Sequence, residues 1–267
     1  MLIGISGKIG SGKDTCAKII QFISTYSYNF DKTTQVFDIN RINYPDSKWQ
    51  VKRMADKLKD IVCIMTGCTR TALENQSFKD SLLPNEWQVH EVRNEGYGQL
   101  MGTYGTKEEA ESVVKNASSY TKYSYKQSER TYRWLLQYIG TDLFRDKLHN
   151  NVHINMLFSE YKLKSDPSIK WNDGADTNKM YPDYHIYPNW IIPDVRFPNE
   201  AEAIKSRKGI LLRVNRWRED HFEYNVKEHY SETALDDYVF PFIIKNDSTI
   251  EDLVKNVKVF LEFNNLI

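Results

Sequence analysis

The chain has few cysteines, no net charge and no long apolar run, and each of these absences excludes a class of protein. Its 267 residues include three cysteines, Cys16, Cys63 and Cys68, which are odd in number and lack the spacing of metal ligands. We therefore expect reduced thiols rather than a disulfide framework. Lysine and arginine together number 36, as do aspartate and glutamate, so the formal net charge is zero. Proteins that bind duplex nucleic acid usually carry a basic excess, so we expect no nucleic-acid partner.

Segments that would direct the chain to a membrane are also absent from the sequence. No run of about 18 apolar residues occurs, so we expect no membrane span. Glycine-rich sequence begins four residues in, which leaves no room for a signal peptide, and we expect a cytoplasmic protein. With 40% hydrophobic and 27% charged residues, the chain suits one α/β domain with an insertion, or two small domains.

Short apolar stretches alternate with stretches of helical periodicity. We expect strands at residues 2–6, 49–54, 190–193, 209–214 and 241–245. Helical spacing after the first strand is set by Cys16, Ile19, Ile20 and Ile23. A helix over residues 58–65 should stop before Gly67, and the last helix should begin after Ser248 as N-cap, with Glu251 completing a capping box. Strands that alternate with helices predict a parallel sheet covered by helices on both faces.

Residues 7–13, GKIGSGK, fit the pattern G-x-x-x-x-G-K between a predicted strand and a predicted helix. Glycines allow the backbone to curl around an anion, and the helix presents its positive end to phosphate. Lys13 would reach the β- and γ-phosphates of a nucleoside triphosphate. The alternative is a glycine-rich turn with surface lysines and no role in phosphate binding. The predicted ATP-binding residues of this loop are Gly7, Gly10, Ser11, Gly12 and Lys13.

Asp14 stands where the strict pattern has a serine or threonine that binds magnesium, and Thr15 follows one place later. Asp14 could contact the metal directly or through a water, or it could serve only as an acid in the first turn of the helix. A second candidate metal ligand is Asp194, which directly follows an apolar strand, because ligands bind at strand ends in open α/β sheets. Arg196 lies two residues on and could point at the same phosphates; the alternative is a strand-to-helix turn with a salt bridge.

Two further stretches combine cations with polar side chains. In RWLLQYIGTDL, Arg133 and Gln137 share a helix face, where an arginine could clamp a phosphate and an amide could read a base edge. We expect Trp134, Leu135, Tyr138 and Ile139 to form a buried stripe, Gly140 to end that helix, and Asp142 and Arg145 to open the next. The second stretch follows the fourth strand and holds Arg213, Arg216, Arg218, His221 and His229; it could bring mobile positive charge to a phosphate. An exposed polar helix face and a solvated loop are the respective alternatives.

Taken together, these motifs resemble the phage deoxynucleoside monophosphate kinases, within the P-loop nucleoside monophosphate kinase group. The matching stretches are SGKDT at 11–15, RWLLQYIGTDL at 133–143, IIPDVRFPNE at 191–200, HYSETAL at 229–235, IKNDSTIEDL at 244–253 and, more weakly, MADKLKDIV at 54–62. The resemblance implies that Asp-Thr is a tolerated version of the loop. It also implies a three-layer fold with a five-stranded parallel sheet and a mobile lid. We expect one kinase domain over 1–267, a lid at 215–231, and an inserted excursion at 84–130, read as a hairpin and one helix in the acceptor-binding region.

The resemblance also implies roles for single residues. Lys13, Arg196, Arg216 and Arg218 would be catalytic, the last two on the lid. The metal ligands would come from Asp14, Thr15 and Asp194, and the adenine would lie beside Asn246 and Asp247. The acceptor pocket would hold Lys59, Arg133, Gln137, Asp142 and Arg145.

The implied reaction is transfer of the ATP γ-phosphoryl to the 5′-phosphate of a deoxynucleoside monophosphate, with Mg²⁺ and small nucleotides as the only partners, in the host cytoplasm if the gene is a phage gene. The oligomeric state stays open, with a homodimer among the options. Two alternatives remain: a P-loop kinase for another small acceptor such as dephospho-coenzyme A, and a P-loop ATP-binding regulatory protein that is not a kinase.

Overall fold

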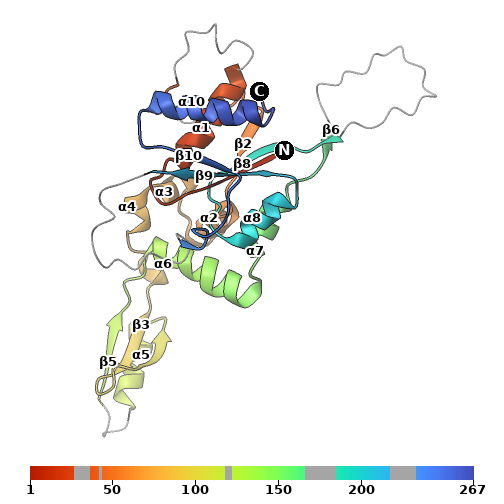
Figure 1. Ribbon diagram of the computed structural model, residues 1–267. Helices are drawn as coiled ribbons and strands as arrows, with labels where there is room; N and C mark the ends of the chain where they lie inside the picture. Colours follow the sequence, from red (N-terminus) through yellow and green to blue (C-terminus); the bar gives the residue numbers. More distant parts are fainter. Residues whose placement is uncertain (27–36, 42–43, 118–121, 166–184, 217–232) are drawn as a thin grey trace, which may run out of the picture. The chain divides into compact units, whose positions relative to one another are not determined.

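The structure is a computed structural model, and it describes residues 1–26, 37–41, 44–117, 122–165, 185–216 and 233–267 (Figure 1). Its internal contacts divide the chain into two compact units. The first unit consists of Met1–Met54 and His153–Ile267, and the second of Ala55–Val152. Each unit has its own hydrophobic core, and each is described separately.

The first unit contains a five-stranded sheet in the order β10-β9-β1-β8-β2, with all neighbours parallel. This confirms the predicted sheet. The strands are β1 (Leu2–Ser6), β2 (Trp49–Val51), β8 (Asn189–Ile192), β9 (Ile210–Asn215) and β10 (Phe242–Lys245). β2 is shorter than predicted, because the N–H of Met54 turns to the carboxylate of Asp194. A short antiparallel pair joins β6 (Lys164–Ser165) and β7 (His185–Ile186).

Helices cover both faces of this sheet, as predicted (Figure 1). Every residue of β1 is buried, and its side chains alternate between two cores, as the period-two geometry of a strand requires. Ile3 and Ile5 pack with α1 (Lys13–Tyr26) and α10 (Ile250–Phe263). Leu2 packs on the other face with α7 (Val152–Phe158) and α8 (Pro198–Lys205). The first unit therefore has three layers, helices, sheet and helices, and loops follow the ends of the strands.

The last helix, α10, is present as predicted but has a different N-cap residue. Leu253, Val257 and Leu261 are buried against the sheet. The N-cap is Thr249 rather than Ser248: its Oγ1 accepts the N–H of Asp252 at 3.2 Å. The Ser248 hydroxyl instead donates to the Asp252 carboxylate at 2.6 Å. Two adjacent hydroxyl residues both fit the capping pattern, and the helix starts after the second.

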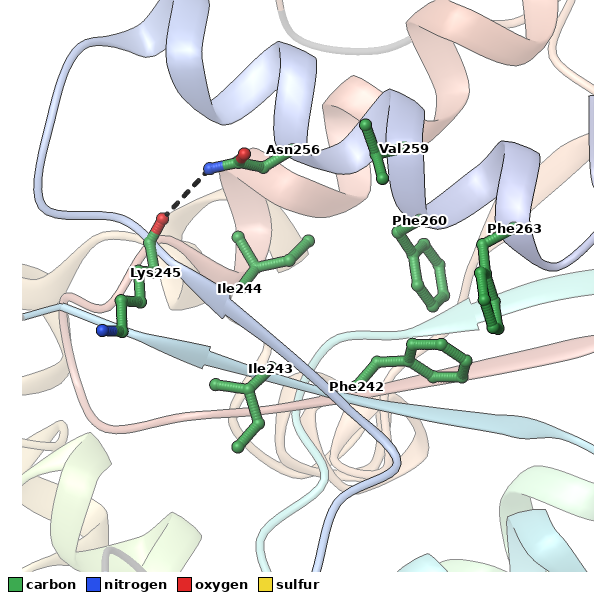
Figure 2. Close-up of a pocket in the computed structure, with 8 residues that line it drawn as sticks. All are labelled: Phe242, Ile243, Ile244, Lys245, Asn256, Val259, Phe260 and Phe263. Carbon is green, nitrogen blue, oxygen red and sulfur yellow. Dashed lines mark hydrogen bonds between the residues drawn. The ribbon is translucent and has the colours of Figure 1, made fainter.

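A groove of about 610 Å³ runs between β10, the edge strand of the sheet, and α10 (Figure 2). Aromatic and aliphatic side chains line it, including Phe242, Phe260 and Phe263, and Lys245 lies at one end. With so little positive charge, this groove is unsuited to a polyphosphate, which needs several charged or N–H donors.

The second unit is built from short helices and a small sheet. Its elements are α2 (Asp56–Thr66), α3 (Arg70–Glu74), α4 (Gln76–Lys79), η2 (Asn85–Trp87), β3 (His90–Asn94), β4 (Leu100–Tyr104), α5 (Lys107–Lys115), β5 (Tyr123–Gln127), α6 (Tyr132–Gln137) and the π-helical segment η3 (Tyr138–Leu148). α2 ends as predicted at Gly67, which has a left-handed φ of 73° and donates its N–H to the Cys63 carbonyl.

Within residues 84–130 the chain forms a three-stranded antiparallel sheet in the order β4-β3-β5, with α5 packed against it. A hairpin and one helix were predicted, and the third strand was missed. Its sequence, YSYKQ, alternates tyrosine with polar residues over only four positions, in a stretch that is polar throughout, and such a short signal is weak.

The predicted helix stop at Gly140 is wrong. Gly140 is buried and has no left-handed φ, and the chain continues through η3 to Leu148. The predicted stripe is also only half buried: Leu135 and Ile139 are in the core, whereas the rings of Trp134 and Tyr138 stack on each other at 5.0 Å and remain partly exposed. Among the helices that the structure describes, none combines the length and the apolar character needed to cross a bilayer.

Candidate active site

The glycine loop between β1 and α1 has a backbone that only glycine can supply at two positions. Gly7 and Gly12 have φ values of 151° and 99°. A Cβ at Gly7 would lie 2.3 Å from the Val214 carbonyl oxygen, and one at Gly12 would lie 2.4 Å from Nδ2 of Asn246. Gly10 also has a positive φ, 74°. The loop is therefore packed directly on the ends of β9 and β10, in the curled form that points N–H groups inward.

Two polar side chains of this loop are poised for an anion. Lys13 donates from Nζ to the carbonyl oxygens of Gly7 at 2.6 Å and Lys8 at 2.7 Å, so its ammonium group lies over the loop. Ser11 is 3% exposed, and its hydroxyl has no hydrogen-bond partner among the described residues. A buried hydroxyl without a partner is unfavourable. A phosphate oxygen in the loop would satisfy it.

Asp14 is held by a residue that the sequence did not indicate. Nη2 of Arg53 lies 2.6 Å from Oδ1 of Asp14, and both side chains are partly exposed. Thr15, the next candidate metal ligand, is half-buried. One Asp14 oxygen is thus already engaged by a guanidinium group.

Asp194 lies at the same end of the sheet as the glycine loop. Only Pro193 separates it from the end of β8. Both of its carboxylate oxygens accept the N–H of Met54, at 3.2 and 3.1 Å, and the next N–H, from Val195, donates to the carbonyl of Ile5 in β1. Among the described residues no three acidic, histidine or cysteine side chains form a ready metal cluster. Magnesium sites on nucleotides need only one or two carboxylates, because the phosphates and water complete the coordination. The oxygen donors of Asp14, Thr15 and Asp194 fit that ion.

Arg196 begins the turn into α8. Its backbone N–H donates to the Glu200 carboxylate at 2.8 Å, as does that of Phe197 at 3.2 Å. Glu200 is 3% exposed, and its carboxylate satisfies the N–H of Phe197, the N-cap residue of α8. The buried Glu200 carboxylate therefore fixes the backbone at Arg196 and Phe197.

The ends of β9 and β10 bring Asn246 to the loop. Asn246 donates its backbone N–H to the Asn215 carbonyl at 2.7 Å and its side-chain amide to the Ser11 carbonyl at 2.8 Å. Arg216 is exposed just after β9. Arg218, His221 and His229 lie outside the described residues, as does nearly all of the predicted lid.

Arg213 differs from the mobile cation that the sequence suggested. Its side chain is 13% exposed, its Nη2 lies 2.6 Å from Oδ1 of Asp236, and its Nη1 donates to the Leu235 carbonyl at 2.8 Å. Asp236 also lies 3.7 Å from Nζ of Lys8 in the glycine loop. Arg213 thus fastens the segment around Asp236 beside the loop.

In the second unit, the candidate acceptor residues lie in ion pairs. Lys59 contacts both carboxylate oxygens of Glu74, at 2.8 and 2.9 Å. Arg70 joins Glu74 to Asp56 and Asp60. Burial would raise the pKa of Glu74, but the bonds from Lys59 and Arg70 outweigh it and leave this pKa lowered.

Arg133 on α6 contacts Asp80 through Nε at 2.5 Å, and its Nη2 contacts Gln76 at 3.1 Å. Gln137 and Asp142 are exposed and Arg145 is half-buried. Neither Arg53 nor Asp80 could have been found from the sequence, since their partners are 39 and 53 residues away.

A parallel sheet of five strands, a glycine loop between its central strand and the following helix, and an acid at the end of the neighbouring strand together define the fold of P-loop kinases. The comparison with known families gives the particular group. The family model described as "Deoxynucleotide monophosphate kinase" matches residues 1–257, and the chain belongs to that family.

A curated relative is found in Acanthamoeba polyphaga mimivirus, under the name "Putative deoxynucleotide monophosphate kinase". It is 35% identical to this chain over 89 residues, which make up 32% of this chain. The match spans 39% of the length of the viral protein.

Proposed function

We propose that this protein is an ATP-dependent deoxynucleoside monophosphate kinase, which transfers the γ-phosphoryl of ATP to the 5′-phosphate of the acceptor to give the diphosphate and ADP. The observation that carries the proposal is the glycine loop, with its buried unsatisfied Ser11 hydroxyl and Lys13 folded over it. Membership of the kinase family supports the choice of acceptor.

The donor side of the reaction falls to the first unit. The loop N–H groups, Ser11 and Lys13 would bind the β- and γ-phosphates, and Asn246 would keep the loop closed beside the adenine. Bound Mg²⁺ would neutralise phosphate charge, and the oxygen donors that would hold it are Asp14, Thr15 and Asp194.

The acceptor attacks with a phosphate oxygen that is already an anion, so the site needs no strong general base. Positioning and charge stabilisation would supply the catalysis. Arg196, Arg216 and Arg218 would stabilise the transferring group, the last two from a lid at 215–231. The acceptor would be bound by Lys59, Arg133, Gln137, Asp142 and Arg145, in a region enlarged by the excursion at 84–130.

The test is an ADP-release screen with Mg²⁺-ATP against the common ribo- and deoxyribonucleoside monophosphates, and with dephospho-coenzyme A as a competing acceptor. Lys13→Ala should lose turnover by on the order of a hundredfold or more, because it removes a charge from the transition state. Lys18→Ala is a matched control on α1, where Nζ of Lys18 donates to the Ile39 carbonyl at 3.3 Å and lies outside the glycine loop. Near-normal turnover by Lys13→Ala, with the fold intact by circular dichroism, would show that the site is assigned wrongly. Acceptor-independent ADP release would favour a regulatory ATPase.

A further inference from the structure

Arg133 is gripped along one edge by two side chains from α4. Its Nε and Nη2 contact the two oxygens of Asp80 at 2.5 and 3.1 Å, and Nη2 also donates to Oε1 of Gln76 at 3.1 Å. Gln76 and Asp80 are four residues apart, at the first residue and the C-cap of α4, so they lie on one side of that turn. The bond from Asp80 is the largest cause of the raised pKa of Arg133.

The segment that carries these two acceptors is itself fixed to α6. The ring of Phe78 packs on that of Tyr132 at a centroid distance of 4.6 Å. The Ser81 carbonyl accepts the Tyr132 N–H at 3.3 Å, and the Leu83 N–H donates to the Arg130 carbonyl at 2.9 Å. The contact between α4 and Arg133 is therefore part of a packed structure and not a chance meeting of two surface side chains.

The other end of the guanidinium group is left for a ligand. Arginine has five N–H donors in a planar fork, and the Asp80 and Gln76 bonds use those of Nε and Nη2. Nη1 has no hydrogen-bond partner within the part of the chain that the structure describes. The Arg133 side chain is 41% exposed, so an anion can reach it.

We propose that Asp80 and Gln76 are positioning residues that hold the Arg133 guanidinium by its Nε–Nη2 edge and present Nη1 to the 5′-phosphate of the acceptor nucleotide. This inference rests on the proposed function, in which Arg133 binds that phosphate. The gain is entropic, because a free arginine side chain must lose rotamer freedom when it binds a ligand, and here that freedom is already lost. A phosphate on Nη1 leaves the Asp80 bonds intact.

The opposite role for Asp80 is competition, in which its carboxylate occupies Arg133 until a phosphate displaces it. The two roles predict opposite effects of removing the carboxylate. Loss of positioning weakens acceptor binding, whereas loss of a competitor strengthens it. Gln76, which carries no charge, can only position.

The experiment compares Asp80→Ala, Asp80→Asn and Gln76→Ala with the wild type. It measures the dissociation constant of a deoxynucleoside monophosphate by calorimetry, together with KM for acceptor and for ATP. Asp80→Ala should raise the acceptor constants on the order of tenfold, as loss of an orienting partner does at other sites, and leave KM for ATP unchanged. Asp80→Asn keeps one oxygen that can accept from Nε, so its acceptor constants should lie between those of the wild type and of Asp80→Ala. Glu262→Gln is the control, an exposed acid on α10 paired with Lys258.

Each result decides the matter. A lower or unchanged acceptor constant in a folded Asp80→Ala protein overturns the positioning role, and so does an equal rise in KM for ATP. If Asp80→Ala does not fold, Asp80→Asn and Gln76→Ala carry the same comparison. A wild-type protein that binds no deoxynucleoside monophosphate defeats the proposed function and this inference with it, whereas a wild type that binds and a variant that binds equally well defeat the inference alone.

Discussion

Replacing Gly7 by alanine should destabilise the first unit far more than replacing an exposed glycine by alanine would. Gly7 directly follows β1 and starts the loop, with φ at 151°. The new Cβ would lie 2.3 Å from the carbonyl oxygen of Val214 and 2.6 Å from Oγ of Ser11. The first of these is backbone in the neighbouring strand β9, so no side-chain rotation can relieve the contact.

The expected cost has two parts. A non-glycine residue in this region of backbone space costs about 1–3 kcal/mol. Forcing an extra carbon into a packed site costs a further ~1–3 kcal/mol, because β9 or the loop must move. The sum, roughly 2–6 kcal/mol, is a large part of the stability of an ordinary domain.

Two other glycines separate the backbone term from the packing term. Gly67 and Gly98 have φ values of 73° and 62°, and a Cβ at either would have no heavy atom within 4 Å. Their alanine variants should lose only about 1–2 kcal/mol. Urea unfolding followed by tryptophan fluorescence gives all three values. If Gly7→Ala is no less stable than Gly98→Ala, the close packing of the loop on β9 is not a feature of the molecule.

Two predictions concern titratable groups. Burial raises the pKa of Cys16 to about 12, so native protein at pH 8 should expose at most two thiols to a thiol reagent, from Cys63 and Cys68, with the third appearing only in denaturant; three fast-reacting thiols would contradict the structure. Bonds from Ser248, Lys255 and Thr249 lower the pKa of Asp252 from 3.8 to about 2. Because this pKa is lower in the folded than in the unfolded protein, the ionised Asp252 stabilises the fold at pH values above its unfolded pKa of 3.8. This stabilisation is lost as the pH falls toward 2. The stability difference between wild type and Asp252→Asn should therefore vanish in that range, and a difference that persists at pH 2 would refute the assignment.

The sheet was predictable because its central strands, β1 and β8, are buried on both faces. The segments LIGI and WIIP are apolar without interruption, which is typical of parallel strands between helix layers. The strands of the second unit carry no such signal, and β5 was missed for that reason. The error at β2 has another cause: the strand was predicted to reach Met54, but the N–H of Met54 bonds to Asp194 instead of to a strand.

Two glycines with similar sequence surroundings ended differently. Gly67 takes a left-handed φ and closes α2, as expected of a glycine after a periodic stretch. Gly140 stays helical, because η3 continues past it and carries Phe144 back into the core of the second unit. Tertiary packing of residues further along the chain overrides the local signal, and no local pattern contains that information.

The places of some candidate site residues along the chain were predictable, but the side chains that contact candidate residues in the folded protein were not. The loop, Asp194 and Arg196 follow from their place after a strand, which sequence reveals. Arg53, Asp80 and Asp236 act through folded contacts with residues 39, 53 and 23 positions away. A single sequence does not show which residues so far apart meet in the folded protein.

These partners also give a physical meaning to the zero net charge. Lys59 and Arg133 each contact a carboxylate of the chain itself, and Lys13 contacts carbonyl oxygens of its own loop. In each unit, therefore, these cations among the candidate residues already contact acceptors of the chain itself. A nucleotide must share or replace these internal acceptors, so its binding should gain less from bare attraction than from the fit of phosphate to groups already held in place. On this argument the binding of nucleotide should depend on salt less steeply than the number of nearby cations implies, while depending strongly on the residues that orient them.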